Sequence, residues 1–248
     1  MKKTHIAGTV LVLIFAAVVF FFGWTQFKVK AGTCGILISK TGGVNSDPVI
    51  PGQFSWHWES LIPTNAELRM FSTAPYTAVK TAEGTLPSAE TYGSVYDTKP
   101  DFTYRFDFSV SARVDPQGIA ELVKEGVVTD SSGLTAYLDS AYTVMANKAS
   151  AYILDRAAAN PSFRPESLKT SDILNGTGAA EIWPYIVFTD FSVTSAKLPD
   201  YTLYTNARDS YIQEQKRLQA RASERKKKVG ELLEQFPELQ DLFSGKQQ

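Results

Sequence analysis

The feature that most constrains this 248-residue chain is a long apolar stretch near its start, from Ile6 to Trp24, in which Thr9 is the one polar residue. At the rise of an α-helix this stretch spans roughly 28 Å, about the thickness of the hydrocarbon core of a bilayer. Backbone groups in lipid must pair within their own segment, so a helix is the form that fits. We therefore expect one transmembrane helix over residues 6–24, after a short tail of residues 1–5. The anchor residues expected are Ile6, Leu11, Phe15, Phe20 and Trp24.

A cleaved secretory signal is the competing interpretation of the same stretch. Residues 1–5 would be its basic leader, and residues 29–31 (VKA) faintly resemble a small-residue cleavage site. However, the apolar stretch is longer than the usual core of ~7–15 residues, and Lys28 and Lys30 would flank the cleaved bond. These observations favour a retained anchor. Positive-inside counting slightly favours a cytoplasmic N-terminus and an exported soluble body.

Composition argues against several classes of function for the soluble part. A net charge of −1 is not that of a general nucleic-acid binder. The one cysteine, Cys34, rules out an intrachain disulfide framework. The two histidines, His5 and His57, do not give a His/Cys cluster with metal-ligand spacing. We expect neither a metal site nor a cofactor.

Residues 25–100 are expected to form a β-rich part beside the anchor. Residues 25–40 mix β-branched residues with glycines and favour a strand. Further strands are expected over residues 65–73 and 76–81. The stretch 82–100, rich in Gly, Pro, Ser and Thr, is typical of a loop or a weak hairpin.

Within this part, a Pro51-Gly52 turn precedes three aromatic residues at alternate positions. The alternation indicates a strand with one aromatic face. We expect this face to pack in the core, with shallow insertion into a membrane surface as the alternative. The three residues are Phe54, Trp56 and Trp58.

Residues 101–198 are expected to form a second part of α+β character. From Phe102 to Val114 apolar and polar residues alternate without exception, which indicates a long half-buried strand. Asp115-Pro116 favours the start of a helix, with Asp115 as its cap. Two more helices and a last strand are expected over residues 134–159, 166–174 and 182–197.

A charged helix with a heptad-like seam is expected within residues 199–248. The seam positions advance by four and three residues from Tyr211 and become apolar in the second half. A lone helix would expose this apolar seam to water, so we expect a second copy of the chain to cover it. Docking of the helix onto the chain's own domain is the alternative. Pro237 predicts a break near Phe236. The oligomerisation residues expected are Tyr211, Leu218, Ala222, Val229, Leu232, Phe236, Leu239 and Phe243.

Four short motifs occur in a specific order along the chain. Residues 29–36 (VKAGTCGI) form a glycine-spaced opening strand, residues 50–54 (IPGQF) a Pro-Gly turn, residues 101–116 a strand ending in Asp-Pro, and residues 191–201 a Leu-Pro segment before the charged helix. Together they resemble the SPFH/band 7 family of stomatins, prohibitins, flotillins and the bacterial HflK/HflC pair. The resemblance covers about residues 25–230, and each motif alone is weak. The extension after Pro199 is short for the family, and residues 84–98 lack a family pattern.

The resemblance implies an α+β SPFH/band 7 domain, a twisted and mostly antiparallel sheet with packed helices, lying close to a bilayer. It implies lateral assembly of the chain with itself into a ring or cage, contact with membrane lipid, and no enzymatic activity. A membrane protease of FtsH type or a small NfeD-like membrane protein is the partner that the family suggests. The expected location is the bacterial inner membrane, with the soluble domain on the exported side.

The function expected is therefore that of a membrane-anchored oligomeric scaffold, which organises or regulates other membrane proteins or a membrane microdomain. A monomeric, membrane-anchored binding module is the alternative. A serine hydrolase is a more distant one, because only commonplace pairs such as Ser39-Lys40 or Lys148 with Ser150 offer a nucleophile and a base. The sequence has no G-x-S-x-G elbow, Walker loop or dinucleotide fingerprint.

Overall fold

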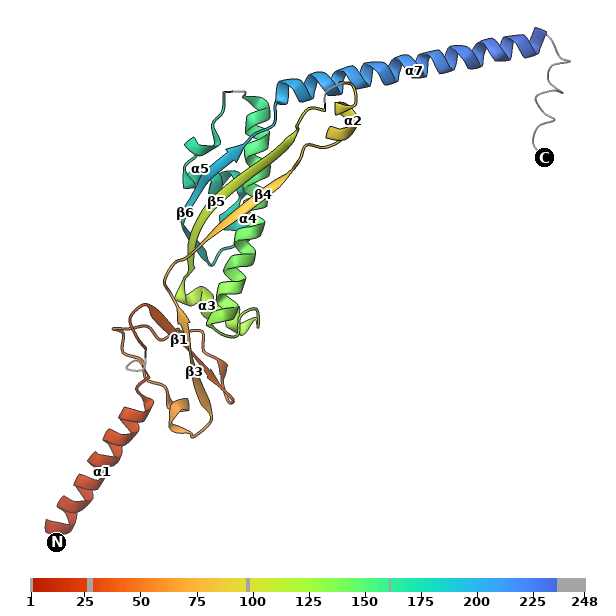
Figure 1. Cartoon of the computed structure of the whole chain (residues 1–248). Helices are drawn as coiled ribbons and strands as arrows, with labels where there is room; N and C mark the ends of the chain where they lie inside the picture. The colour runs from red at the N-terminus through yellow and green to blue at the C-terminus, as the bar shows by residue number, and fades with distance from the viewer. Residues whose placement is uncertain (1, 26–28, 97–98, 161, 236–248) are drawn as a thin grey trace. The chain divides into compact units, whose positions relative to one another are not determined.

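The computed structural model in Figure 1 describes the following residues: 2–25, 29–96, 99–160 and 162–235. The chain divides into two compact units, each built from two separate stretches of sequence. Unit 1 combines Met1–Ala82 with Arg105–Ala196, and unit 2 combines Glu83–Tyr104 with Lys197–Gln248. The fold class is α+β, with two small antiparallel sheets and an N-terminal apolar helix.

The first sheet of unit 1 has the strand order β2-β1-β3, and both neighbours of β1 run antiparallel to it. Cys34 on β1 lies opposite Phe71 on β3, and both side chains are fully buried. The strand expected over 65–73 is confirmed, but the one expected over 25–40 begins late, because Gly32 takes a positive φ of 78° in the turn before β1. The elements that precede or form this sheet are α1 (Lys2–Gly23), β1 (Thr33–Ser39), β2 (Gly43–Val44), the 3₁₀ turn η2 (Trp58–Leu61) and β3 (Ala66–Ser72).

The second sheet has the order β4-β5-β6, formed by β4 (Tyr76–Thr85), β5 (Thr103–Val114) and β6 (Ile186–Lys197). The alternation predicted for the central strand is confirmed, since every second side chain from Phe106 to Val114 is buried. The opposite face of β5 is polar and is tied to its neighbour by side chains. Thr81 donates to Asp107 at 2.6 Å.

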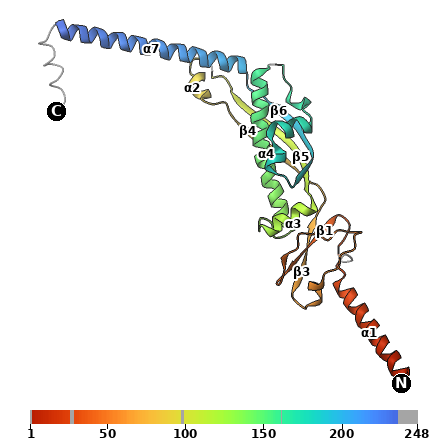
Figure 2. The same ribbon diagram turned by 180° about the vertical axis from the view of Figure 1, so that it is seen from behind.

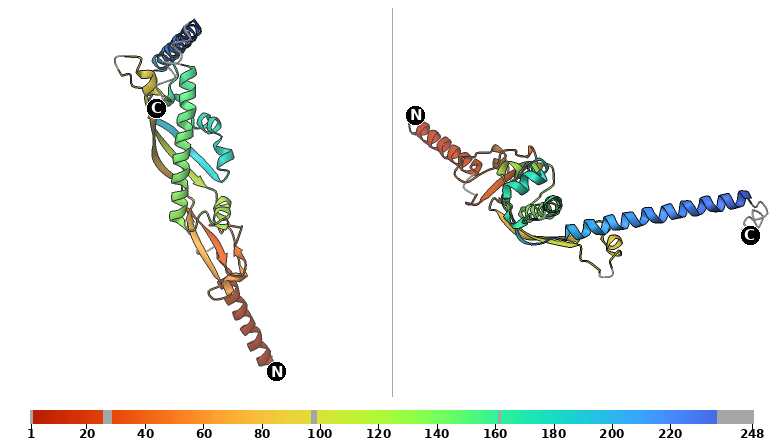
Figure 3. Two further views of the ribbon diagram at one scale, coloured as in Figure 1. Left: turned by 90° about the vertical axis from the view of Figure 1, so that its right-hand side faces the viewer. Right: turned by 90° about the horizontal axis from the view of Figure 1, so that it is seen from above.

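Helices cover the apolar face of the second sheet. Figure 2 and the right-hand view of Figure 3 show α4 and α5 on the same side of it. Tyr142 of α4 donates to the carbonyl of Tyr76 on β4 at 2.7 Å, which fixes the helix to the sheet. The helices of this part and their 3₁₀ turn are α3 (Pro116–Lys124), α4 (Ser131–Ala159), η3 (Pro165–Ser167), α5 (Thr170–Thr177) and α6 (Ala179–Ile182).

The starts of α4 and α5 and the capping of α3 differ from expectation. Asp115 stands at the N-cap of α3, but its carboxylate accepts no capping hydrogen bond. α4 begins three residues before Leu134, because Asp130 caps it by accepting from the amide of Gly133 at 2.7 Å. The helix expected over 166–174 is displaced toward the C-terminus, to α5.

The described residues of unit 2 form two helices, the short α2 (Ala89–Gly93) and the long α7 (Tyr201–Gln235). α2 lies in the stretch 82–100 that was expected to be a loop or weak hairpin. α7 is a continuous helix of 35 residues. The break predicted near Phe236 lies outside the described residues.

Candidate functional site

The first candidate surface is the apolar helix α1. Its side chains stand out into the surroundings: Ile6, Leu11 and Phe15 are each more than half exposed. The segment His5–Gly23 is the one described helix that is long and apolar enough to cross a membrane, and it lies near the N-terminus. A membrane span and a signal sequence both have these properties.

The last turn of α1 is held by a loop from much later in the chain, residues 53–58, which we call the aromatic loop. The amide of His57 donates to the carbonyl of Gly23 at 2.9 Å, and the amide of Thr25 donates to the carbonyl of Ser55 at 3.0 Å. The final carbonyls of a helix have no partner inside the helix and must find one elsewhere. The aromatic loop supplies one to the end of α1.

The side chain of Trp56 completes this contact. Its indole Nε1 donates to the carbonyl of Phe20 at 3.2 Å. The ring lies so close to the helix that a Cβ added at Gly23 would be 2.2 Å from Nε1. Phe54 stacks on Phe20, with ring centroids 5.9 Å apart and an interplanar angle of 16°. Only a glycine at position 23 leaves room for the indole, so this sequence position is matched to Trp56.

The aromatic loop is not the buried strand that its alternation predicted. Phe54 is 63% exposed, Trp56 38% and Trp58 52%. Trp56 makes one isolated bridge, to Trp24, and Trp58 already begins η2. The expectation of a core position is wrong, because the loop crosses the end of α1 instead of joining the β2-β1-β3 sheet. The three side chains leave an exposed aromatic surface beside an apolar helix.

Two polar residues of the aromatic loop form a group with Asn45 that the sequence analysis did not find. The ring nitrogen Nε2 of His57 is 2.8 Å from the Oγ of Ser55, and Nδ1 is 3.3 Å from the Nδ2 of Asn45. Asn45 uses its Oδ1 to accept the amide of Asp47 at 2.9 Å, so its amino group faces the ring. With Nδ1 accepting from Asn45, a neutral His57 ring has its proton on Nε2, which faces the Ser55 hydroxyl.

This proton arrangement is opposite to that of a serine nucleophile, whose histidine presents a bare Nε2 to the hydroxyl. The serines nominated from the sequence are also engaged. Buried Ser39 accepts the backbone amide three residues later, and buried Ser150 donates to the carbonyl three residues earlier, each at 2.8 Å. The lysines paired with them in sequence are exposed and therefore not desolvated: Lys40 and Lys148.

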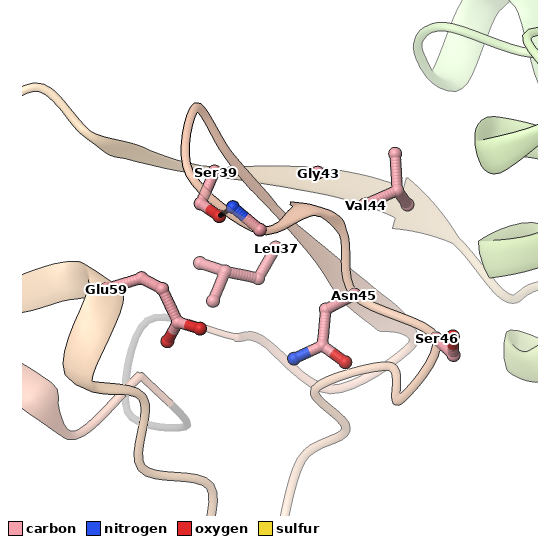
Figure 4. A pocket seen from close by; sticks show the side chains of 8 residues that line it. Leu37, Ser39, Gly43, Val44, Asn45, Ser46 and Glu59 are labelled. Carbon is pink, nitrogen blue, oxygen red and sulfur yellow. Dashed lines mark hydrogen bonds between the residues drawn. The ribbon is translucent and has the colours of Figure 1, made fainter.

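A polar pocket of about 270 Å³ opens beside this group, between the β1–β2 turn and η2 (Figure 4). The side chain of Glu59 points toward it, and its Oε2 is buried without a hydrogen-bond partner. Among the described residues, no three His, Cys, Asp or Glu side chains gather into a metal-binding group. The pocket holds one carboxylate, which is too little to define a metal site.

In unit 2, the start of α7 is fixed by a group of aromatic residues that we call the tyrosine cluster. Tyr204 donates its hydroxyl hydrogen to the carbonyl of Pro87 at 2.7 Å and meets the ring of Phe102 edge-on at 5.4 Å. Tyr92 of α2 contacts the rings of both Tyr204 and Tyr211, each at 5.7 Å. These contacts place α2 against the first three turns of α7. The remaining members are Leu86, Ala89, Tyr96, Tyr201, Leu203 and Ala207.

Beyond the tyrosine cluster, the seam of α7 is open. Tyr211 is half-buried against Tyr92, whereas Leu218 is 46% exposed, Val229 49% and Leu232 50%. Ala222 is also exposed. Three of the expected oligomerisation residues lie outside the described residues: Phe236, Leu239 and Phe243.

Comparisons with known proteins add one relative. No protein-family model matches the chain. An uncharacterized protein of Treponema pallidum (strain Nichols) is 27% identical over 194 residues. The match covers 76% of this chain and 65% of that protein, so the chain spans less than two thirds of the relative's length.

Proposed function

We propose that this chain is a membrane-anchored protein that associates laterally with copies of itself and so organises or regulates other membrane proteins. The observation that carries the proposal is the open seam of α7. Beyond Tyr211 this helix exposes about half of each of Leu218, Val229 and Leu232 to water. A helix with an apolar stripe gains stability when a neighbour covers it. Copies confined to one membrane meet often, so weak lateral contacts add up.

The contact between α1 and the aromatic loop supports a retained anchor over a cleaved signal. Cleavage after the apolar stretch would remove the carbonyls of Phe20 and Gly23 that the aromatic loop uses as acceptors. It would also uncover one face of the Trp56 indole. A segment that completes the hydrogen bonds of a folded unit is a poor candidate for removal.

The aromatic loop supports contact with the membrane surface. Tryptophan rings prefer the interface between lipid and water, where the apolar ring and the polar N–H are both satisfied. Phe54, Trp56 and Trp58 stand at the end of α1, where the chain would leave the hydrocarbon. They form the part of unit 1 that is best suited to rest on lipid.

The finer features of the proposal come from the resemblance to the SPFH/band 7 family. They are a ring or cage, a membrane protease of FtsH type or an NfeD-like protein as partner, and an exported soluble domain. The coiled-coil role of residues 199–248 belongs with them. The engaged serines Ser39 and Ser150, together with the tautomer of His57, are consistent with a scaffold and offer no support for a hydrolase.

Light scattering on the gently solubilised full chain tests the proposal. Wild-type protein should be a large particle, and Leu232→Asp or truncation after Gln213 should reduce its mass while circular dichroism remains that of a folded protein. The matched control is Gln219→Asp, which adds the same charge at another exposed position of α7. A wild-type chain that is a stable monomer would refute the proposal in favour of the monomeric binding module. An unchanged mass for Leu232→Asp would show that the seam is not the contact.

A further inference from the structure

Unit 2 contains a pocket of about 670 Å³ that no part of the function above uses. It lies between α2 and the residues that lead into β5. Ala89, Gly93 and Phe102 line it and are buried, and the half-buried side chains of Tyr96 and Pro100 also line it. A volume of this size accommodates several large apolar side chains.

The charges around the pocket are nearly balanced. Asp101 is bound by the ammonium group of Lys197 at 2.6 Å, and this contact, with hydrogen bonds from Thr103, holds the pKa of the carboxyl well below its usual range. Asp101 is therefore a neutralised part of the wall. The other charged lining residues, Glu90 and Lys99, are exposed and opposite in sign. The pocket thus suits apolar side chains, and its balanced wall does not select for the charge of an occupant.

Large apolar side chains of this kind occur in the segment that follows α7. Residues 236–243 read FPELQDLF and hold two phenylalanines and two leucines among two acidic residues. They follow directly on α7, whose last described residue is Gln235. Four of its eight side chains are large and apolar, and such side chains gain stability when a partner surface covers them.

The length of α7 decides whose pocket the segment can reach. Tyr211 lies at the tyrosine cluster next to α2, and the continuous helix from residue 211 to 235 extends about 36 Å away from it. Residues 236–243, even fully extended, span at most about 29 Å. The segment therefore falls short of the pocket of its own chain. A second copy is the occupant that geometry allows.

We infer that residues 236–243 of one copy dock into the α2 pocket of a neighbouring copy. The inference rests on the proposed self-association and names its interface. Each copy offers a pocket at the start of α7 and a peptide at its end, so the contact is heterologous. Contacts of this kind close into rings when the rotation between copies permits.

Disulfide trapping between two separately tagged full-length proteins tests this contact. One protein carries Ser94→Cys at an exposed position of the pocket wall, and the other carries Gln240→Cys within the docking segment. The native Cys34 is fully buried and does not compete. After mixing and mild oxidation, we expect a disulfide-linked heterodimer that carries both tags. Glu90→Cys, at another exposed lining position, provides a second trap if the Ser94 variant folds poorly.

Gln219→Cys is the matched control, because this residue is exposed in the middle of α7. Several-fold more heterodimer with Ser94→Cys or Glu90→Cys than with Gln219→Cys supports the inference. Equal yields would overturn it and indicate side-by-side pairing of helices. If light scattering shows an oligomer but neither pocket cysteine is trapped, the docking contact is refuted while self-association stands. If the full chain is monomeric, both proposals fail.

Discussion

Replacing Gly23 with alanine should loosen the contact between α1 and the aromatic loop. The added Cβ would lie 2.2 Å from Nε1 and 2.3 Å from Cε2 of the Trp56 indole, so the ring must move away. Overpacking of this kind costs about 1–3 kcal/mol. The displaced indole also loses its hydrogen bond to Phe20, for which a net loss of about 1 kcal/mol is typical. We therefore expect local opening to become easier by about 2–4 kcal/mol, or roughly 30- to 900-fold.

Amide hydrogen exchange in micelles measures this opening at the two amides that join the helix to the loop. The amides of Thr25 and His57 should exchange faster in Gly23→Ala by the factor above. Gly8→Ala is the matched control, because nothing lies within 4 Å of a Cβ at that position of the same helix. Equal exchange rates in the two variants would show that the indole does not occupy the space beside Gly23.

Two further predictions concern titratable groups. Hydrogen bonds from the Ser132 hydroxyl and the Gly133 amide hold the pKa of Asp130 below its usual value. The charged carboxylate therefore stabilises the fold above the unfolded pKa near 3.9, and that contribution is lost as the pH falls through the lower native pKa. Asp130→Asn should reduce the fall in melting temperature between about pH 5 and pH 2, and parallel curves for the two proteins would contradict this. Burial raises the pKa of Cys34 to about 11, so iodoacetamide at pH 8 should label it only after unfolding in urea; fast labelling of folded protein would contradict the burial.

The elements that sequence predicted best are those whose pattern allows one geometry. The alternation from Phe102 to Val114 cannot bury one face of a helix, and it gave β5 to within a residue. The long helix α4 was also expected, although its start was placed late. The sequence does contain a signal for the true start of α4, because Asp130 directly precedes two serines. A capping aspartate marks the start of a helix better than the first apolar residue does.

The aromatic loop shows where local pattern misleads. Alternate aromatics at 54, 56 and 58 have the spacing of a strand, but Trp56 is positioned by the carbonyl of Phe20, 36 residues earlier. No window around Trp56 contains that partner. The glycine that makes the contact possible, Gly23, looks in sequence like an ordinary small residue of an apolar helix.

Residues 82–100 were mistaken for a similar reason. Their Gly, Pro, Ser and Thr content is that of a loop, and a helix as short as α2 has little stability of its own. The tyrosine cluster stabilises it, and the bond from Tyr204 to Pro87 joins residues 117 positions apart. The pocket proposed for docking depends on this long-range packing, which no local pattern of residues indicates.

The way α1 ends has a practical consequence for anyone who wishes to study unit 1 in water. The boundary between the apolar helix and the folded body lies within the last turn of α1, and not after it. Phe20 and Gly23 belong to the helix, but their carbonyls also accept hydrogen bonds from the aromatic loop. A shortened polypeptide that starts at residue 25 would lack Phe20 and Gly23, against which the Trp56 indole packs. A polypeptide that starts at residue 19 would keep these contacts, although it would expose a few phenylalanine side chains to water. We expect it to be the more stable of the two in solution.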